Sequence, residues 1–302
     1  MLSRVADALY WMGRYIERAE HTARVLEAMR DLRIDLREVD RKVADQQWRG
    51  ALKALSLPEL SLSRLVLDPS EPTSLLCSVS RARENARQVR EVISPEMWEK
   101  LNQSYWMLRD SVTAAQNEGT LSQALTGIVT SSFLWDGVTD ASMIRGEGWL
   151  FLKLGKFVER IEGLARMVLG RLDQGATPED GQAANVTWPT LLKSLDAVDA
   201  YRLAHPKRVD RDAVIGFLLF EAEFPRSVRF STATAADLSL RLRQLHPAAG
   251  QRVERAFGRL AARIEYADLE SFEDEQLKPF LLEIGSGVSD ASGILQKAFF
   301  LC

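Results

Sequence analysis

The segment YWMGRYIERAEHTARVL, residues 10–26, decides the fold class, because the apolar side chains in and around it recur with the period of an α-helix. Spacings of three and four residues place these side chains on one stripe of a helix. We expect this helix to begin near Ser3, with Ser3 as its N-cap, and to run into the thirties. The stripe consists of Val5, Leu9, Met12, Ile16, Ala19, Ala23 and Leu26.

Large aromatic side chains share the other side of this helix with charged ones. A second stretch, LFLKLGKFVERIEGLARMVL at 150–169, repeats the pattern G-[R/K]-[Y/F]-[I/V]-E-R-x-E-x-x-A-R. Aromatic rings among guanidinium groups predict a sheltered polar layer, in which the rings pack and the cations find carboxylates. In the first copy the side chains of this layer are Tyr10, Trp11, Arg14, Glu17, Arg18 and His21.

Helical patterns continue through the rest of the chain, and no segment shows period-two alternation with hairpin turns. Ser94-Pro95-Glu96 combines a cap, a first-turn proline and an acid, which predicts another helix start. The predicted fold is all-α: a multi-helix bundle of about eight to ten helices, with a long N-terminal helix and the internally repeated Glu-Arg helix. Further helices are expected at about 121–143, 147–172, 188–204, 210–222, 226–245, 249–268 and 274–301.

A stretch rich in glycine, proline and small polar residues, QGATPEDGQAAN at 174–185, is the one credible internal boundary. It predicts an N-terminal helical bundle at 1–174, which carries both Glu-Arg motifs, and a C-terminal helical region at 187–302 packed on it. One continuous domain is the alternative.

Bulk composition limits the classes of function. The 302 residues are 46% hydrophobic and 27% charged, with a formal net charge of -3, which suits a globular protein and argues against a nucleic-acid partner. Cys77 and Cys302 are far apart, so neither a disulfide framework nor a thiolate metal site is expected. The first twenty residues interrupt every apolar run with charges, which predicts a soluble cytoplasmic protein without a membrane partner.

Metal and cofactor chemistry is not expected. Glu17, Glu20 and His21 imitate half of a helical di-metal site, but the second Glu-x-x-His motif is missing, and His205 and His246 stand apart. The sequence contains no phosphate-binding glycine loop and no nucleophile motif, so no catalytic residue is assigned.

The repeated charged helix supports two main interpretations. In the first, Glu17 and Glu159 each bind an arginine of the partner helix and fix the register of the two helices. In the second, Arg14, Arg18, Arg160 and Arg166 present their forks to a carboxylate or phosphate. Pairing between neighbours four residues apart on an exposed surface is a third possibility. Another patch, with Arg83, Arg87 and Arg90 beside Asn85, either joins the same polar seam or forms a solvated basic edge.

The segments MLSRVADALYWMGRYIERAEHTARVL, SRARENARQVREVISPEMWEKLN and FLKLGKFVERIEGLARM resemble the alpha-E domain family, and FPRSVRF at 224–230 looks like a further family element. The resemblance implies a helical domain of unknown biochemical activity, encoded beside or fused to a circularly permuted ATP-grasp protein and often near a transglutaminase-like peptidase. It assigns no catalytic role. Lys153 and Lys156 replace the equivalents of Trp11 and Arg14 in the second copy. The family resemblance and the polar seam together give these candidate binding residues: Arg4, Tyr10, Trp11, Arg14, Glu17, Arg18, Arg24, Asn85, Arg87, Arg90, Glu159, Arg160 and Arg166.

Three functions are compatible with these observations. The first is an accessory or regulatory partner of an ATP-grasp-type peptide or amide ligase, which binds the ligase or an anionic peptide through the buried Arg/Glu seam. The second is an enzyme of the same pathway that uses Glu and Arg residues for positioning and proton transfer. The third is a structural scaffold in which the motifs only hold helices together.

Overall fold

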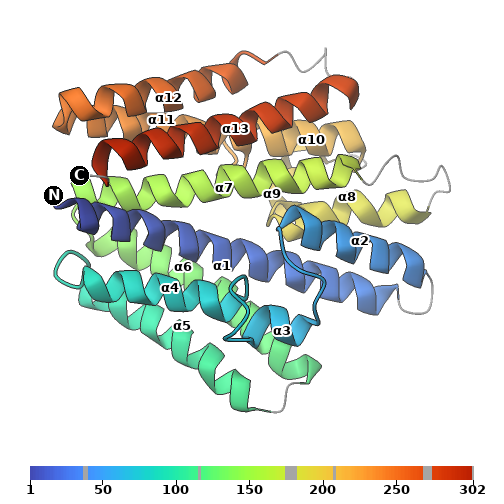
Figure 1. Cartoon of the computed structure of the whole chain (residues 1–302). Helices are drawn as coiled ribbons and strands as arrows, with labels where there is room; N and C mark the ends of the chain where they lie inside the picture. Colours follow the sequence, from blue (N-terminus) through green and yellow to red (C-terminus); the bar gives the residue numbers. More distant parts are fainter. Residues whose placement is uncertain (37–39, 115–116, 174–181, 207–208, 268–273, 301–302) are drawn as a thin grey trace.

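All regular structure in the described part of the chain is helical, which confirms the predicted fold class. The computed structural model describes residues 1–36, 40–114, 117–173, 182–206, 209–267 and 274–300. These residues form thirteen helices, more than predicted, because the segment expected at 188–204 divides into two helices and several helices are short. The helices in Figure 1 are α1 (Ser3–Asp35), α2 (Arg41–Ala54), α3 (Leu62–Leu67), α4 (Leu75–Gln88), α5 (Pro95–Thr113), α6 (Glu118–Ser142), α7 (Glu147–Asp173), α8 (Gln182–Ser194), α9 (Val198–Ala204), α10 (Arg211–Phe220), α11 (Val228–Leu245), α12 (Pro247–Glu265) and α13 (Asp274–Phe299).

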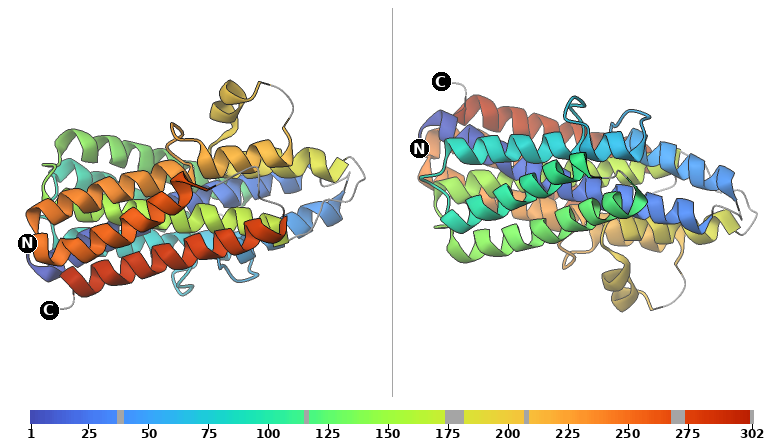
Figure 2. Two further views of the ribbon diagram at one scale, coloured as in Figure 1. Left: turned by 90° about the horizontal axis from the view of Figure 1, so that it is seen from above. Right: turned by 90° about the horizontal axis from the view of Figure 1, so that it is seen from below.

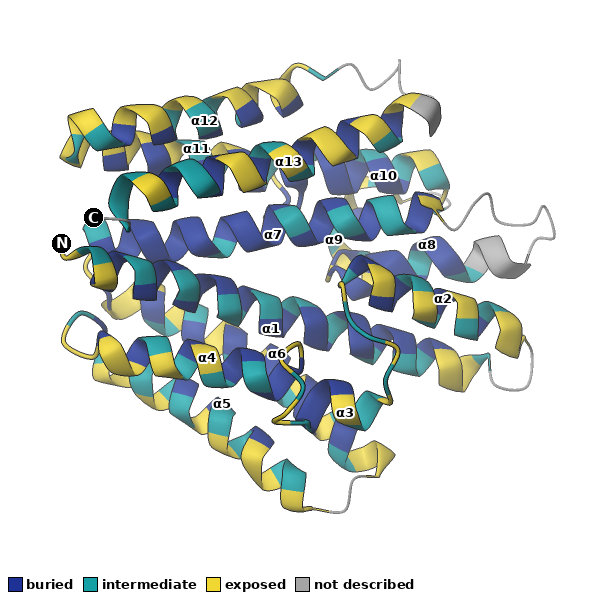
Figure 3. Cartoon of the chain, in the orientation of Figure 1, coloured by how far each residue is buried: buried dark blue, intermediate teal, exposed yellow. Residues whose placement is uncertain are grey.

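Helices α1 and α7, which carry the two Glu-Arg motifs, run parallel through the middle of the molecule (Figure 1). The expected apolar stripe of α1 is mostly buried, but so are several residues of its charged side, among them Tyr10, Arg14 and Glu17. Figure 3 shows the same enclosure for α7, whereas the outer helices alternate buried and exposed positions. Ser3 begins α1 as predicted but is not its cap, since Leu2 occupies that position and donates or accepts no side-chain hydrogen bond.

Each central helix belongs to a four-helix bundle of its own. Helix α1 packs on α4 and α6, and α5 packs on those two; helix α7 packs on α11 and α13, and α12 packs on those two. The two bundles lie on opposite sides of the α1–α7 contact (Figures 1 and 2). Ser94 caps α5 by accepting a hydrogen bond from the Met97 amide, as predicted. Helices α2 and α8 follow the central helices and cover their C-terminal parts.

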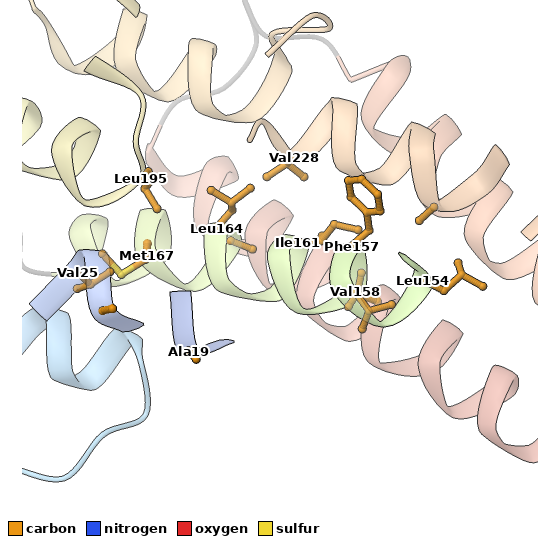
Figure 4. Close-up of a cluster of buried hydrophobic side chains, with 14 of the residues drawn as sticks. Ala19, Val25, Leu154, Phe157, Val158, Ile161, Leu164, Met167, Leu195 and Val228 are labelled. Atoms are coloured by element: carbon orange, nitrogen blue, oxygen red, sulfur yellow. The ribbon is translucent and has the colours of Figure 1, made fainter. Parts of the chain in front are cut away.

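An apolar core surrounds the central pair. Figure 4 shows side chains of α7, among them Phe157, Ile161 and Leu164, facing Val228 of α11 and Leu195 after α8. Such burial on several sides of a helix supplies most of its stability, because apolar area removed from water contributes about 25 cal/mol per Å². The polar residues of α1 and α7 therefore lie in a largely dry environment.

The second half of the chain repeats the first, well beyond the Glu-Arg helix noticed in the sequence. Four pairs of matching segments occur in the same order and at equivalent places of the two bundles, and α9 has no counterpart. Tandem copies of one helical unit explain this arrangement. The pairs are GRYIERAEHTAR at 13–24 with GKFVERIEGLAR at 155–166, WRGALKALS at 48–56 with WPTLLKSLD at 188–196, PTS at 72–74 with PRS at 225–227, and GVTDAS at 137–142 with GVSDAS at 287–292.

Local geometry agrees with this repeat. The hydroxyl of Ser74 caps α4 and donates to the Asp68 carbonyl at 2.8 Å, and Ser227 caps α11 and donates to the Glu221 carbonyl at 2.5 Å. The repeat divides the chain between α6 and α7. The division predicted at 174–187 stays a prediction, because residues 174–181 lie outside the described residues.

Candidate functional site

Two glycines bring the backbones of α1 and α7 into direct contact. A Cβ atom at Gly13 would overlap the carbonyl oxygen of Leu152, and one at Gly155 would overlap the carbonyl oxygen of Tyr10. These contacts are counterparts in the repeat, because Leu152 matches Tyr10. A residue with a side chain could not fit at either position, so the glycines set the register in which the charged side chains meet.

One turn after the glycines, the Glu-Arg motifs bind each other reciprocally. Arg18 donates from Nε and Nη2 to the two carboxylate oxygens of Glu159 at 2.6 and 2.9 Å. Arg160 donates to Glu17 in the same way, also at 2.6 and 2.9 Å. The predicted inter-helix ion-pair network is therefore confirmed: each glutamate binds the arginine of the partner helix through two parallel hydrogen bonds.

The buried carboxylates stay ionised. Burial alone would raise the pKa of Glu159, but the guanidinium groups of Arg18 and Arg14 outweigh it and lower the pKa to about 2. Burial opposes ionisation of Glu17 too, yet Arg160 keeps its pKa below the usual value. Each carboxylate is a weak base near neutral pH, because its pKa is lowered and both of its oxygens are bound by arginine.

Around Glu17 the charges form what we call the closed cluster. Glu20 accepts hydrogen bonds from Arg24 on the next turn and from Arg226, which precedes α11, the latter at 2.6 Å. Asp196 lies 3.2 Å from Nη2 of Arg24 and 3.6 Å from Nε of Arg226. Arg160 also donates to the Pro225 carbonyl at 3.1 Å. The closed cluster consists of Glu17, Glu20, Arg24, Arg160, Asp196 and Arg226.

Around Glu159 the charges form what we call the open cluster. Arg14 bridges Glu159 and Glu162 at 2.7 and 2.6 Å, and Arg18 keeps 36% of its side chain exposed. Nε of Arg166 is buried without a hydrogen-bond partner, and Arg166 makes no ion pair with any described residue. The open cluster consists of Arg14, Arg18, Glu159, Glu162 and Arg166.

Comparison with known families places this geometry. A family profile named Alpha-E, described as "a predicted alpha-helical domain with a conserved ER motif", matches residues 1–300. The chain belongs to the Alpha-E family. In this Alpha-E chain the Glu-Arg dipeptides Glu17-Arg18 and Glu159-Arg160 form the reciprocal pairs between the central helices.

Relatives of this Alpha-E chain are longer proteins. The uncharacterized protein Mb2597 of Mycobacterium bovis and the uncharacterized protein Rv2567 of Mycobacterium tuberculosis are each 25% identical to it over 315 aligned residues, which cover 94% of this chain. The chain spans about a third, 35%, of the length of the curated relatives it matches. No solved structure matches it.

Two aromatic residues of the predicted site line the Alpha-E seam. Tyr10 is fully buried, and its hydroxyl lies 2.7 Å from the Ser292 hydroxyl of α13. The guanidinium carbon of Arg14 lies 5.2 Å from the centre of the Trp11 ring, within the range of a cation–π contact. Aromatic rings thus cover the charges, as their position in the sequence predicted.

Four predicted residues lie apart from the two clusters. Arg4 is exposed on the first turn of α1, and Asn85 is half-buried on α4. Arg87 is exposed and pairs with Glu84 on its own helix, and Arg90 packs on Trp98, 5.0 Å from the ring centre. Among the described residues, no ion pair or hydrogen bond joins these four to the open or closed cluster. Arg87, Arg90 and Asn85 thus follow the alternative of a solvated basic edge.

Sequence reasoning did not place several functional neighbours in the seam. Arg226 and Asp196 meet Glu20 from distant parts of the chain, and Glu162 binds Arg14 across the helix pair. The repeat carried a signal for Glu20 and Glu162, since both follow the Glu-Arg dipeptide by two residues. Arg226 lies in the family-like segment FPRSVRF, but nothing in that segment indicates that it meets Glu20, and no local pattern marks Asp196; each comes from a turn between helices.

Metal binding at Glu17, Glu20 and His21 does not fit the geometry. Both carboxylates are bound by arginines. Burial lowers the pKa of His21 to about 4, and its ring packs on Gly163 between the two clusters. Across the described residues, no group of three His, Cys, Asp or Glu is arranged for a metal ion.

Within the same described residues, none of the helices is both long and apolar enough to cross a bilayer.

Proposed function

We propose that this Alpha-E chain is a non-catalytic helical partner of an ATP-grasp-type ligase that forms peptide or amide bonds. The resemblance of its Glu-Arg helices to a family encoded beside such ligases suggests the partner. The observation that carries the proposal is an exposed apolar surface at one end of the bundle, which we call the docking end. It consists of Met1, Leu2, Ile144 and Leu245, with Arg145 and Arg241 beside them.

Ile144 is the most unusual residue of the docking end. It lies in the tight turn between α6 and α7, closed by a hydrogen bond from the Gly146 amide to the Ile144 carbonyl at 2.8 Å, and is 88% exposed. Turns of this kind favour polar residues and glycine. Leu2 and Leu245 are more than half exposed nearby. Apolar side chains gathered on one exposed end support a protein-binding surface there.

The contacts around Glu147 keep this surface in one arrangement. Its carboxylate accepts a hydrogen bond from the amino group of Met1 at 3.0 Å and lies 2.7 Å from Nε2 of His246. Arg241 of α11 donates to the Arg145 carbonyl at 3.1 Å. Three segments that are distant in sequence are thereby fixed next to one another, and a preformed surface binds with a smaller loss of conformational entropy.

Both ends of the described chain lie at the docking end (Figure 2). Phe300, after α13, packs on Tyr10 of α1 with ring centres 5.5 Å apart. In the longer relatives about two-thirds of the polypeptide lies beyond the matched region. In such a longer protein, the additional polypeptide would meet this domain at the end where its first helix begins and its last helix ends. This position supports the docking end as the partner surface.

A non-catalytic role is supported by the state of the buried acids. Glu17, Glu20 and Glu159 are ionised and bound by guanidinium groups, so none is poised to remove a proton from a substrate. The reciprocal pairs hold α1 and α7 in register, as the scaffold interpretation requires. Partner binding is then a property of the exposed surface rather than of the pairs themselves.

Co-purification with the circularly permuted ATP-grasp protein tests this proposal. We expect a defined complex from the unaltered chain, and at least a tenfold loss of affinity in Ile144→Asp and Leu245→Asp, because a charge buried in an apolar contact is strongly unfavourable. Leu203→Asp on α9 and Leu282→Asp on α13 alter equally exposed leucines elsewhere and serve as controls. Absence of a complex between the two folded proteins would contradict the proposed function, and equal losses in all four variants would contradict the docking end.

A further inference from the structure

The open cluster lacks a carboxylate that its counterpart contains. In the closed cluster Asp196 follows α8 and lies beside Arg24. The repeat places Ser56, after α2, at the equivalent position, and matches Arg166 with Arg24. A serine hydroxyl cannot neutralise a guanidinium, so the turn after α2 supplies no negative charge to Arg166.

The backbones after α2 and α8 confirm that Ser56 and Asp196 are equivalent. Both residues have left-handed backbone conformations, with φ of 55° and 57°. In each case the next amide closes the helix end: Leu57 donates to the Leu52 carbonyl at 2.8 Å, and Ala197 donates to the Leu192 carbonyl at 2.9 Å. The two turns are therefore built alike and differ in the side chain that they present.

The end of α2 also lies against the part of α7 that carries Arg166. A Cβ atom at Gly170, one turn after Arg166, would come within 2.9 Å of the Ala54 Cβ. Ser56 follows Ala54 by two residues. The residues that match Gly170 and Ala54 are Ala28 and Ser194; Ala28 lines one surface pocket with Arg24 and Asp196, and Ser194 lines another with Gly170 and Ala54.

A second difference leaves Arg166 without a carboxylate. Arg226 binds Glu20 in the closed cluster, but its counterpart is Thr73, so no arginine reaches Glu162 from that turn. Arg14 binds Glu162 instead. The closed cluster therefore contains three arginines and three acids, whereas the open cluster contains three arginines and two acids. The guanidinium left over is Arg166.

We infer that the open cluster binds one carboxylate from outside the chain, at Arg166 beside Ser56, in the place that Asp196 fills in the closed cluster. The chemical class is a monocarboxylate, such as a glutamate or aspartate side chain of an acidic peptide. Arginine binds a carboxylate through charge-assisted hydrogen bonds, and the half-buried position of Arg166 limits the competition from water. A more highly charged anion is disfavoured, because Glu159 and Glu162 lie nearby.

The test uses the isolated chain and two matched probes, N-acetyl-glutamate amide and its uncharged analogue N-acetyl-glutamine amide. The Nε–H resonances of Arg166 and Arg24 are followed by NMR at constant ionic strength. We expect the glutamate probe to shift the Arg166 resonance saturably while Arg24, whose Nε donates to Glu20 and whose Nη2 lies 3.2 Å from Asp196, stays unchanged. No response at Arg166, an equal response at Arg24, or the same response to the glutamine probe would overturn the inference.

The variant Ser56→Asp adds an independent measurement. It should supply the missing carboxylate internally, abolish the response of Arg166 to the probe, and raise Tm by about 2 °C. The rise should disappear in the double variant with Arg166→Gln, since Arg166 is the intended partner. A rise that persists in the double variant would overturn the assignment of the site. Because no ligase is present, these outcomes are independent of the proposed partner role.

Discussion

The closed and open clusters are built around the same Glu-Arg dipeptides, but their second glutamates differ in partners and in pKa. Glu20 and Glu162 are counterparts, yet Glu20 binds two arginines and has its pKa lowered to about 2, despite the opposing effect of burial. Burial raises the pKa of Glu162, and Arg14 only partly compensates. The difference arises in the turns that approach each cluster, which carry Asp196 and Arg226 on one side and Ser56 and Thr73 on the other.

This comparison separates two roles for one motif. The Glu-Arg dipeptides make the same reciprocal pairs on both sides, with equal distances, and therefore belong to the contact between α1 and α7. Everything that distinguishes the clusters lies outside the dipeptides. One copy of a duplicated unit thus completes its charge balance internally, while the other keeps a guanidinium for an external group.

Replacement of the contact glycines should break both clusters at once and have the largest effect. Gly13→Ala or Gly155→Ala would force α1 and α7 apart, because the added methyl group overlaps a backbone carbonyl that cannot rotate away. We expect a loss of more than about 4 kcal/mol in the free energy of unfolding, measured with denaturant. Gly137→Ala on α6 meets no atom within 4 Å and should be neutral or stabilising. Similar losses at all three positions would contradict this account of the contact.

Removing one counterpart acid at a time should separate the clusters. Glu20→Gln leaves Arg24 and Arg226 buried without their carboxylate, and we expect it to cost about 3 kcal/mol. Glu162→Gln leaves Arg14 paired with Glu159, so about 1 kcal/mol or less is expected. The exposed Glu84→Gln, which breaks the surface pair with Arg87, should be close to neutral and is the control. Equal costs at Glu20 and Glu162 would show that the clusters are energetically alike.

Acid should act on the individual carboxylates of the clusters in opposite directions. Glu20 and Glu159 have folded-state pKa values of about 2 against an ordinary 4.5, so their contribution to stability is complete above pH 4.5 and is lost as the pH falls toward 2. Glu162 has a raised pKa, so its protonation above pH 4.5 favours the folded state. Each carboxylate can change stability by up to about 1.4 kcal/mol per pH unit. Carboxyl NMR titrations should show Glu162 protonating first; the reverse order would contradict the comparison.

Loss of the charge on Asp196 should have the smallest effect on stability. It should leave the closed cluster, like the open cluster, without a carboxylate at this position. Asp196→Asn retains a side chain that tolerates the left-handed conformation but removes the carboxylate. Because Asp196 is partly exposed, we expect a loss of about 0.5 kcal/mol, measured by denaturant unfolding. The variant should also make Arg24 responsive to the glutamate probe. If Arg24 stays silent in a folded variant, the two positions are not equivalent in binding.

The sequence was a good guide to the central helices. Their 3.6-residue period, the repeated glycine and the repeated Glu-Arg dipeptide predicted two like helices with a sheltered polar layer, and Arg14, Glu17, Glu159 and Arg160 are buried as that requires. The full repeat was harder to recognise, because α9 is inserted in the second half and shifts the later matches relative to the earlier ones. The basic residues Arg87 and Arg90 fit the same charge pattern, yet both are exposed, Arg87 in the last turn of α4 and Arg90 two residues after its end.

The sequence by itself determined that the chain is helical and that two of its helices carry the same motif, because these features depend on residues one or two turns apart. Only the tertiary structure decided which carboxylate each arginine binds and which cluster is complete. Those outcomes depend on turns such as the one with Arg226, which lies 206 positions from Glu20. A charge that must be neutralised in a dry interior is bound by whichever partner the fold brings within about 3 Å, and sequence distance has no part in that choice.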